Sequence, residues 1–191
     1  MLGRTGGAIF EAYGKEYFKQ TSSLSWSVGG PLEMFRRECY EEIGGYMPLK
    51  GGGTDTIADV MARMKGWKVR SFPDVQVFHH RLTATGQTNI YLARFRQGFR
   101  EYKIGYHPLF HVAKCAYRIV ERPYLIGSLL RFVGFCWAFL FREKREVPYD
   151  VVRFQRNEQI LRLLALLWRR KARLEGADKD ERVDISSHGP S

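Results

Sequence analysis

The segment from residue 52 to residue 81 holds the side chains most able to do chemistry. Asp55 follows a run of three glycines, and the histidine pair His79-His80 ends a later extended stretch. A carboxylate that faces a bound hydroxyl group can accept its proton as the hydroxyl attacks. A neutral imidazole can bind a divalent metal or a phosphate. The segment therefore contains the parts of a base-catalysed site, if the fold brings them together.

Each of these residues also has a structural interpretation, and both stay open. Asp55 stands where a helix would begin, so its carboxylate can cap the free amide hydrogens of the first turn. Asp59, one turn later, is the second candidate for the base, or a residue on a solvated helix face. His79 and His80 point to opposite faces of a regular strand, so only one can face a cleft. The other interpretation of His79 is a hydrogen-bonded histidine at a strand end.

Two further patterns do not lead to a site. His107 and His111 are four residues apart, as metal ligands on one helix face would be, but Pro108 separates them and no third ligand is in view. We therefore interpret both histidines as structural. The glycine run at 51–54 superficially resembles a phosphate-binding loop, but it lacks the lysine and the following Ser or Thr of that motif.

Periodicity and turn signals predict the elements that position these residues. Residues 1–30 alternate glycine pairs with aromatic residues and predict loops and short strands. A helix is predicted over 31–43, ended by two glycines, and a second over 55–65, ended by Gly66. Strands are predicted at 68–72 and 75–79, with a Pro-Asp turn between them. The apolar positions that define the two helices are Leu32, Phe35, Cys39 and Ile43, and Ile57, Val60, Met61 and Met64.

Length, charge and cysteine content limit the class of protein. The 191 residues suit one domain with an appendage. The net charge of +11 is uneven, because residues 91–141 carry eight basic side chains against two acidic ones. Such a band suits anionic lipid head groups or nucleic acid, or is simply a solubilising surface. No nucleic-acid-binding motif is present, so we expect no nucleic-acid partner. Three cysteines without metal-type spacing indicate a reducing compartment.

The C-terminal half has a different amino-acid composition. Helices rich in arginine and aromatic residues are predicted from 91 to about 121, and residues 123–141 form an apolar stretch broken by Arg131. A membrane-spanning helix needs about 20 apolar residues, and a central arginine costs about 2.5–3.5 kcal/mol on insertion. Spanning is possible, but lying in the interface with Arg131 reaching for head groups is favoured. A further amphipathic helix is predicted at 151–174.

An ordered series of short motifs over residues 20–110 resembles the acceptor-side half of bacterial family 2 glycosyltransferases. The motifs are Gly29-Gly30, Met34 to Glu38, Glu42 to Tyr46, Gly53-Thr54-Asp55, Ala62 to Val69 and Val77 to Arg81. In that family a Phe-Arg-Arg helix and a Gly-Gly-Tyr turn precede an acidic pair, whose second acid is the catalytic base, and a strand ending in histidine follows. A looser resemblance to the membrane-proximal tail of polysaccharide-assembling members covers 105–110 and 122–124.

The resemblance implies an α/β fold, namely an incomplete GT-A-like (Rossmann-like) transferase half with C-terminal amphipathic, membrane-associated helices. Residues 1–90 would form the acceptor-side part of the catalytic domain. Residues 91–175 would form the basic, aromatic helical region that contains the apolar segment 123–141. Residues 176–191 are polar and are predicted to be a disordered tail.

The resemblance also implies roles for individual residues. Asp55 matches the catalytic base, and His79 matches the histidine that lies near the metal and the diphosphate in related enzymes. Trp67 matches the aromatic residue at the corner between helix and strand. Thr54, Trp67 and Arg81 are the expected substrate-binding residues. The implied cofactor is a divalent cation, Mg²⁺ or Mn²⁺, in a complete enzyme.

Two departures from the family pattern limit this expectation. Thr54 stands where the family has the first acid of its pair. The nucleotide-binding half of the family, with its Asp-x-Asp metal motif, should precede the matching segment, and only about 20–30 residues do so. We therefore expect a truncated or split product, or one completed by another chain that supplies the donor-binding half.

The expected function is inverting sugar transfer from a nucleotide-sugar to a glycan or lipid-linked acceptor. The basic, aromatic helices would dock on an anionic membrane surface, at the cytoplasmic face of the bacterial inner membrane, either peripherally or weakly inserted. The alternative is a catalytically inactive peripheral membrane adaptor built on the same fold.

Overall fold

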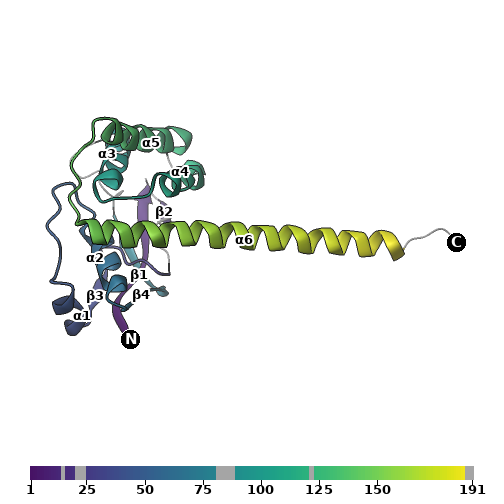
Figure 1. Cartoon of the computed structure of the whole chain (residues 1–191), viewed down its shortest axis with the longest axis horizontal. Helices are drawn as coiled ribbons and strands as arrows, with labels where there is room; N and C mark the ends of the chain where they lie inside the picture. Colours follow the sequence, from purple (N-terminus) through teal and green to yellow (C-terminus); the bar gives the residue numbers. More distant parts are fainter. Residues whose placement is uncertain (14–15, 20–24, 81–88, 121–122, 188–191) are drawn as a thin grey trace.

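The computed structural model describes residues 1–13, 16–19, 25–80, 89–120 and 123–187. These residues form a mixed α/β structure, which confirms the α/β class expected from the sequence (Figure 1). The strands are β1 (Leu2–Tyr13), β2 (Glu16–Lys19), β3 (Glu33–Phe35) and β4 (Lys68–His79). The helices are α1 (Arg37–Glu42), α2 (Thr54–Met64), α3 (Ile90–Lys103), α4 (Pro108–Tyr117), α5 (Tyr124–Leu140) and α6 (Tyr149–Ser187), with a 3-10 turn η1 at Arg118–Val120.

β1 is the central strand of a four-stranded sheet. β4 runs parallel to it along one edge. The antiparallel strands β3 and β2 share the other edge, with β3 against the first half of β1 and β2 against its end. A parallel pair needs a crossover connection, and the chain between β1 and β4 includes α2. Because α2 lies on the connection between these two parallel strands, its direction relative to β1 is set by the sheet.

β1 is longer than the loops and short strands predicted for this region. Glycine disfavours strands, but three glycines in β1 lie where the neighbouring chain comes very close. A Cβ on Gly3 would lie 2.7 Å from Cys39 Sγ, one on Gly6 would lie 2.5 Å from the Leu32 carbonyl oxygen, and one on Gly7 would lie 2.4 Å from that of Val75. These contacts join residues that are far apart in the sequence, so local strand propensity does not predict a long strand here.

The helix predicted over 31–43 is wrong in its first half. Glu33–Phe35 form β3, with Met34 opposite Thr5 of β1, and α1 begins only at Arg37. Pairing with a distant strand overrides the local helical spacing of apolar residues. The predicted end is confirmed, because Gly44 and Gly45 take positive φ angles of 73° and 75° directly after α1.

The turn predicted inside the 68–79 stretch is also wrong. β4 is one strand, and its pairing with β1 shifts register between Gly7, opposite Phe72, and Ala8, opposite Gln76. Residues 73–75 are therefore extra residues on the β4 side, which is the arrangement of a β-bulge. Pro73 lacks an amide hydrogen for the ladder, and a bulge accommodates it.

The predicted helix at 55–65 is confirmed as α2, which packs between two hydrophobic cores. Ile57 and Val60 belong to a core shared with the helical region. Ala58 and Ala62 belong to a core on the sheet side. The first core comprises Ile57, Val60, Tyr102, Ile104, Tyr106, Phe135, Ala138, Val147, Val151 and Val152. The second comprises Val28, Cys39, Ile43, Ala58, Ala62 and Val69.

The apolar segment 123–141 forms α5, which packs closely against α3. A Cβ on Gly98 of α3 would lie 1.8 Å from the Arg131 carbonyl oxygen, and one on Gly134 of α5 would lie 2.1 Å from that of Phe95. The expectation that Arg131 reaches for head groups is wrong, because its side chain is buried and donates to Gln97 Oε1. Among the described helices, none combines the length and the apolar character needed to cross a membrane.

α6 starts in the body of the protein and continues far beyond it (Figure 1). Its first turns contribute Val151 and Val152 to the helical core, and Glu158 accepts from Arg63 of α2 at 2.8 Å and 3.0 Å. The helix predicted at 151–174 is part of it. α6 continues to Ser187, where the sequence predicts a disordered tail from residue 176.

Candidate functional site

Asp55 lies in the first turn of α2 and is not its cap. The cap position belongs to Gly53, whose φ of 94° is in the left-handed region, as is the φ of 79° at Gly52. The Asp55 Oδ1 atom accepts a hydrogen bond from the Thr56 amide at 2.9 Å. Gly53 therefore holds the cap position predicted for Asp55, but the Asp55 carboxylate does accept from one of the free amide hydrogens of the first turn, as the structural interpretation expected.

The second oxygen of Asp55 lies beside Gly30. A Cβ on Gly30 would be 4.0 Å from Asp55 Oδ2, an ordinary van der Waals distance, so the two residues are neighbours. Among the described residues, no hydrogen bond takes up Oδ2, and the side chain is partly exposed. The partial positive charge at a helix start favours an anion here. Asp55 therefore presents a carboxylate oxygen that a ligand can reach.

Contacts with the sheet set the direction of α2. Gly30 lies beside Asp55, and its neighbour Gly29 packs against Ile9 in the second half of β1. Trp67, just past the other end of α2, packs against the start of β1. The first turn of α2 consequently lies farther along β1 than its last turn.

His79 is the last residue of β4 and pairs with Glu11 of β1. Ligands of open α/β sheets bind outside the carboxyl ends of parallel strands. His79 is at that end of β4, whereas the Asp55 backbone is bonded by Arg4, which pairs with Val69 near the start of β4. In the described part of the chain, no hydrogen bond or ion pair links the two side chains.

His79 offers one ligand atom, and His80 lies just past the end of β4. Within the described residues, the Nδ1 atom of His79 is buried and has no hydrogen-bond partner. The His80 side chain is exposed. A divalent cation needs several ligands, and Mg²⁺ prefers oxygen. Among the described residues, no group of three or more His, Cys, Asp or Glu side chains could hold an ion. These residues do not form a cation site by themselves.

The other residues expected at the site are placed differently. Thr54 is the first residue of α2, directly before Asp55, and is partly exposed. Trp67 is at the corner between α2 and β4, about 16 Å from the start of the 11-residue helix at 1.5 Å per residue. Its Nε1 atom donates to Glu42 Oε2 at 2.7 Å. The structure thus does not bring Trp67 to Asp55. Arg81 lies outside the described residues.

Arg4 is the residue that holds the start of α2, and sequence analysis missed it. Its buried guanidinium donates to the Asp55 carbonyl oxygen at 2.6 Å and to Asp59 Oδ1 at 2.6 Å. It also pairs with Glu33 of β3 and lies over the Phe35 ring, 4.8 Å from its centroid. These residues are far apart in the chain, so no local pattern connects them. Arg4 positions Asp55 by fixing the backbone of the first turn.

Asp59, the second candidate for the base, is buried instead of lying on a solvated face. It accepts from Ser27 Oγ at 2.9 Å and the Val28 amide at 3.0 Å, in addition to Arg4. Burial raises the pKa of Asp59 to about 6, against the opposing charge of Arg4. Such a pKa would suit a base, but three protein donors already bind the carboxylate, so a substrate hydroxyl has no access to it.

The glycine loop before α2 is held from the helical region. Glu146 forms an ion pair with Lys103 of α3 at 2.6 Å. Its hydrogen bonds with Lys103 and with the backbone amides of Gly51 and Lys50 lower the pKa of Glu146. Arg100 lies against Gly52, because a Cβ there would be 3.3 Å from its Nη1 atom. The loop is therefore held by α3 and by the segment between α5 and α6.

The structural interpretation of the two downstream histidines suits their positions. His107 caps α4, with its Nδ1 atom accepting from the Leu109 amide at 3.2 Å. His111 is buried, and its Nδ1 atom lies 2.8 Å from Glu101 Oε2. Although burial opposes it, the charges of Lys114 and Arg131 keep the pKa of Glu101 well below its ordinary value.

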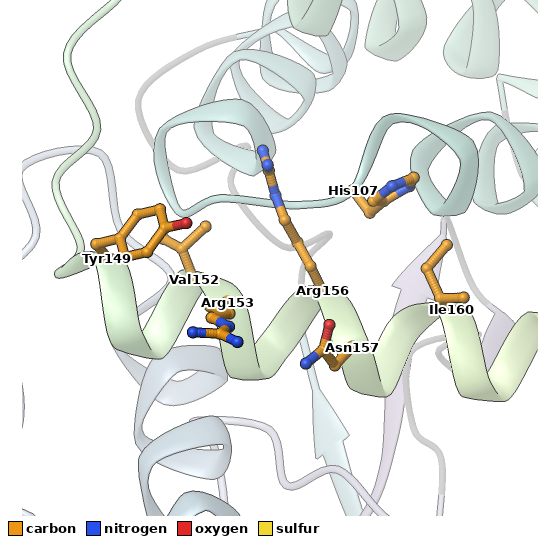
Figure 2. A pocket seen from close by; sticks show the side chains of 7 residues that line it. All are labelled: His107, Tyr149, Val152, Arg153, Arg156, Asn157 and Ile160. Carbon is orange, nitrogen blue, oxygen red and sulfur yellow. The ribbon is translucent and has the colours of Figure 1, made fainter.

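A cavity of about 240 Å³ lies elsewhere, between α6 and the segment that leads into α4 (Figure 2). It is lined by His107, Tyr149, Val152, Arg153, Arg156, Asn157 and Ile160. None of the residues predicted for catalysis lines it. The spacing of its α6 residues, at 149, 152–153, 156–157 and 160, is one face of a helix. The spacing of the two arginines on this helix face is visible in the sequence and could have indicated the cavity.

Comparisons of the chain with protein-family models, with curated proteins and with solved structures returned no match.

Proposed function

We propose that this chain is the acceptor-side part of an inverting glycosyltransferase with a GT-A-like catalytic domain. Residues 1–90 would provide the catalytic base and the edge of the sheet that faces the acceptor. A nucleotide-sugar would be the donor, and a glycan or lipid-linked molecule the acceptor. The donor-binding half is not among the described residues, so another chain or segment would supply it.

One observation carries the proposal. Asp55 is a partly exposed carboxylate in the first turn of α2, and its Oδ2 atom has no hydrogen-bond partner among the described residues. Arg4 fixes the backbone of that turn, and the other carboxylate on α2, Asp59, is committed to protein donors. The order of the motifs around Asp55 resembles that of family 2 glycosyltransferases, in which the matching acid is the base.

The proposed reaction is a single displacement. Asp55 Oδ2 accepts the proton of the acceptor hydroxyl. The hydroxyl oxygen forms a bond with the anomeric carbon, while the bond from that carbon to the donor phosphate oxygen breaks. The nucleoside diphosphate leaves with the bonding electron pair. One displacement from the opposite side inverts the configuration at the anomeric carbon.

The cation expected with this chemistry has one candidate ligand here. His79 Nδ1 is buried and, among the described residues, unpartnered. A bound Mg²⁺ or Mn²⁺ supplies charge that stabilises a leaving diphosphate. Its remaining ligands would come from the donor-binding half, because the described residues do not complete a site. No step above depends on it.

We also propose that the protein works on the inner leaflet of a bacterial membrane. The exposed side of α5 is apolar along its whole length, which suits a helix that lies in the interface. Basic residues flank the helix in sequence, and such residues are attracted to anionic lipid. A lipid-linked acceptor would then meet the sheet edge at the membrane surface.

The test is the substitution Asp55→Asn, which keeps the size of the side chain and removes its basicity. Sugar transfer would be measured from labelled nucleotide-sugars to membrane acceptors, with the full chain and the membranes of its host. We expect transfer to fall by about 10²- to 10⁴-fold, the usual contribution of a general base. Asp74→Asn, in the exposed bulge of β4, makes the same chemical change away from the edge and should leave transfer unchanged.

Transfer that survives Asp55→Asn would refute the role of Asp55. Calorimetry with nucleotide-sugars tests the donor side independently. Micromolar binding of a nucleotide-sugar by the purified chain would contradict the proposal that the donor-binding half comes from elsewhere.

The apolar face of α5 also favours a second candidate, a catalytically inactive membrane adaptor. The adaptor predicts binding to liposomes that Asp55→Asn leaves intact, with no transfer before or after the substitution. Measuring both properties on the same samples separates the two functions.

A further inference from the structure

The cavity beside α6 is lined mainly by hydrogen-bond donors. Arg156 rises from α6 toward the segment before α4, where its Nε atom donates to the Gly105 carbonyl oxygen at 3.0 Å (Figure 2). This bond fixes the Nε atom of the guanidinium against the Gly105 carbonyl. Arg153 and Asn157 are exposed at its rim. Val152 and Ile160 provide the apolar part of the lining.

His107 adds a donor to the same cavity. Its Nδ1 atom accepts from the Leu109 amide, so in the neutral ring the hydrogen is on Nε2. Burial, and then the charge of Arg156, lower the pKa of His107, which keeps the ring neutral at pH 7. His107 is fixed in this orientation because it caps α4.

The charge around the cavity is positive. None of its seven lining residues carries a carboxylate. Burial, and then the charge of Arg145, lower the pKa of Arg156. Arg145 does not line the cavity, but its charge adds to the positive charge near Arg156, and an anion bound there would reduce this repulsion.

We propose that this cavity is a binding site for a phosphate group, carried by a small soluble phosphate or by a phospholipid head group. Guanidinium groups match the oxygens of phosphate in pairs. The volume of about 240 Å³ is below the roughly 300–1,000 Å³ of pockets for drug-sized ligands, so it suits one or two phosphate groups. Asp55 and His79 do not line the cavity, so this site is separate from the proposed transfer and survives if that proposal fails.

The experiment compares the unsubstituted 191-residue chain with its Arg153→Gln variant. Arg153 is exposed, so its loss should leave the fold unchanged, which circular dichroism checks. Arg96→Gln, on the exposed side of α3 and away from the cavity, makes the same change in charge as a control. A lost hydrogen bond to a charged group weakens binding strongly, so we expect the Kd for phosphate to rise tenfold or more in Arg153→Gln. In Arg96→Gln, which loses no contact with the cavity, we expect the Kd to rise less than twofold.

Two arms distinguish the sources of phosphate. In the first arm, inorganic pyrophosphate is titrated into the protein by calorimetry. In the second, binding is measured to phosphatidylcholine vesicles with and without phosphatidic acid. An Arg153-dependent affinity for pyrophosphate identifies a soluble ligand. An Arg153-dependent gain from phosphatidic acid, without pyrophosphate binding, identifies a lipid head group.

Three results would overturn the proposal. One is the absence of saturable binding in both arms. Another is binding that Arg153→Gln leaves unchanged. The last is an equal loss in Arg153→Gln and Arg96→Gln, because that would show attraction to overall charge without a site.

Discussion

At the scale of single residues, two carboxylates on one helix have different roles because their surroundings differ. Asp55 and Asp59 are one turn apart on α2. Asp55 is partly exposed beside Gly30, whereas Asp59 is buried and bound by Arg4 and two other donors. Accessibility, more than basicity, decides which of them can act on a ligand.

The buried position of Asp59 predicts a pH dependence of stability. Its folded-state pKa of about 6 is above the ordinary aspartate pKa of 3.8, so its contribution to stability is complete below pH 4 and is lost as the pH rises through 6. The free energy of unfolding of the wild type, minus that of Asp59→Asn, should fall over this range by an amount on the order of 1–3 kcal/mol. Urea denaturation of both proteins between pH 4 and pH 7 measures the difference.

Ile57→Val is the matched control for that experiment. It also weakens the core around α2 but removes no titratable group, so its difference from the wild type should not change with pH. A difference for Asp59→Asn that rises with pH would show that Arg4 dominates burial and that the folded-state pKa is lowered.

At the scale of elements, the pair α3 and α5 depends on two glycines where the helices touch. Gly98 and Gly134 each face a carbonyl oxygen of the other helix at a distance that excludes a Cβ. This contact turns Arg131 inward, where Gln97 accepts from it and where its charge acts on Glu101. The otherwise apolar helix α5 therefore carries a buried cation that contacts α3.

Gly134→Ala should separate these helices. The added methyl group meets the Phe95 carbonyl at 2.1 Å, and overpacking of this kind costs about 1–3 kcal/mol even after the gain in helix propensity. Chemical denaturation measures the loss. In Gly127→Ala, on the same helix, the nearest atom is Pro123 Cδ at 3.0 Å, so the loss should be smaller. Equal losses would contradict the importance of the α3–α5 contact.

At the scale of the whole molecule, one side of α5 is an apolar surface exposed to solvent. Residues on its outer side are large and exposed, while its inner side packs on α3. The exposed residues are Tyr124, Leu125, Ile126, Leu129, Phe132, Val133, Trp137, Phe139 and Leu140. A continuous exposed surface of this kind marks a contact with membrane or protein, and we propose a membrane surface.

A charge on this surface should weaken membrane binding. The double substitution Leu129→Glu and Trp137→Glu places two acids on the outer side of α5, where both side chains are more than half exposed, at 57% and 52%. We expect binding to anionic vesicles to fall at least tenfold in co-sedimentation, because each apolar side chain contributes about 1.5–3 kcal/mol when buried. Leu109→Glu on α4, also exposed, is the control and should bind as the wild type. Unchanged binding by the double variant would exclude α5 as the contact surface.

Local pattern was sufficient for the parts of the fold that depend on neighbours in the chain. The spacing of Ile57, Val60 and Met61 predicted α2, and glycines marked where α1 and α2 end. The same reading placed a carboxylate at the start of α2 and a histidine at the end of β4. These elements form from periodicity and from turn chemistry, which are properties of the sequence itself.

The tertiary structure decided which residues meet. β3 replaced a predicted helical turn because it pairs with β1, and a bulge replaced a predicted turn in β4. The contact of Arg4 with Asp55 and Asp59, and the cavity between α6 and His107, join residues from distant parts of the chain. Burial and long-range pairing act only after the chain has folded, so the sequence by itself determined the candidate groups and the elements that carry them. Their accessibility and their partners followed from packing.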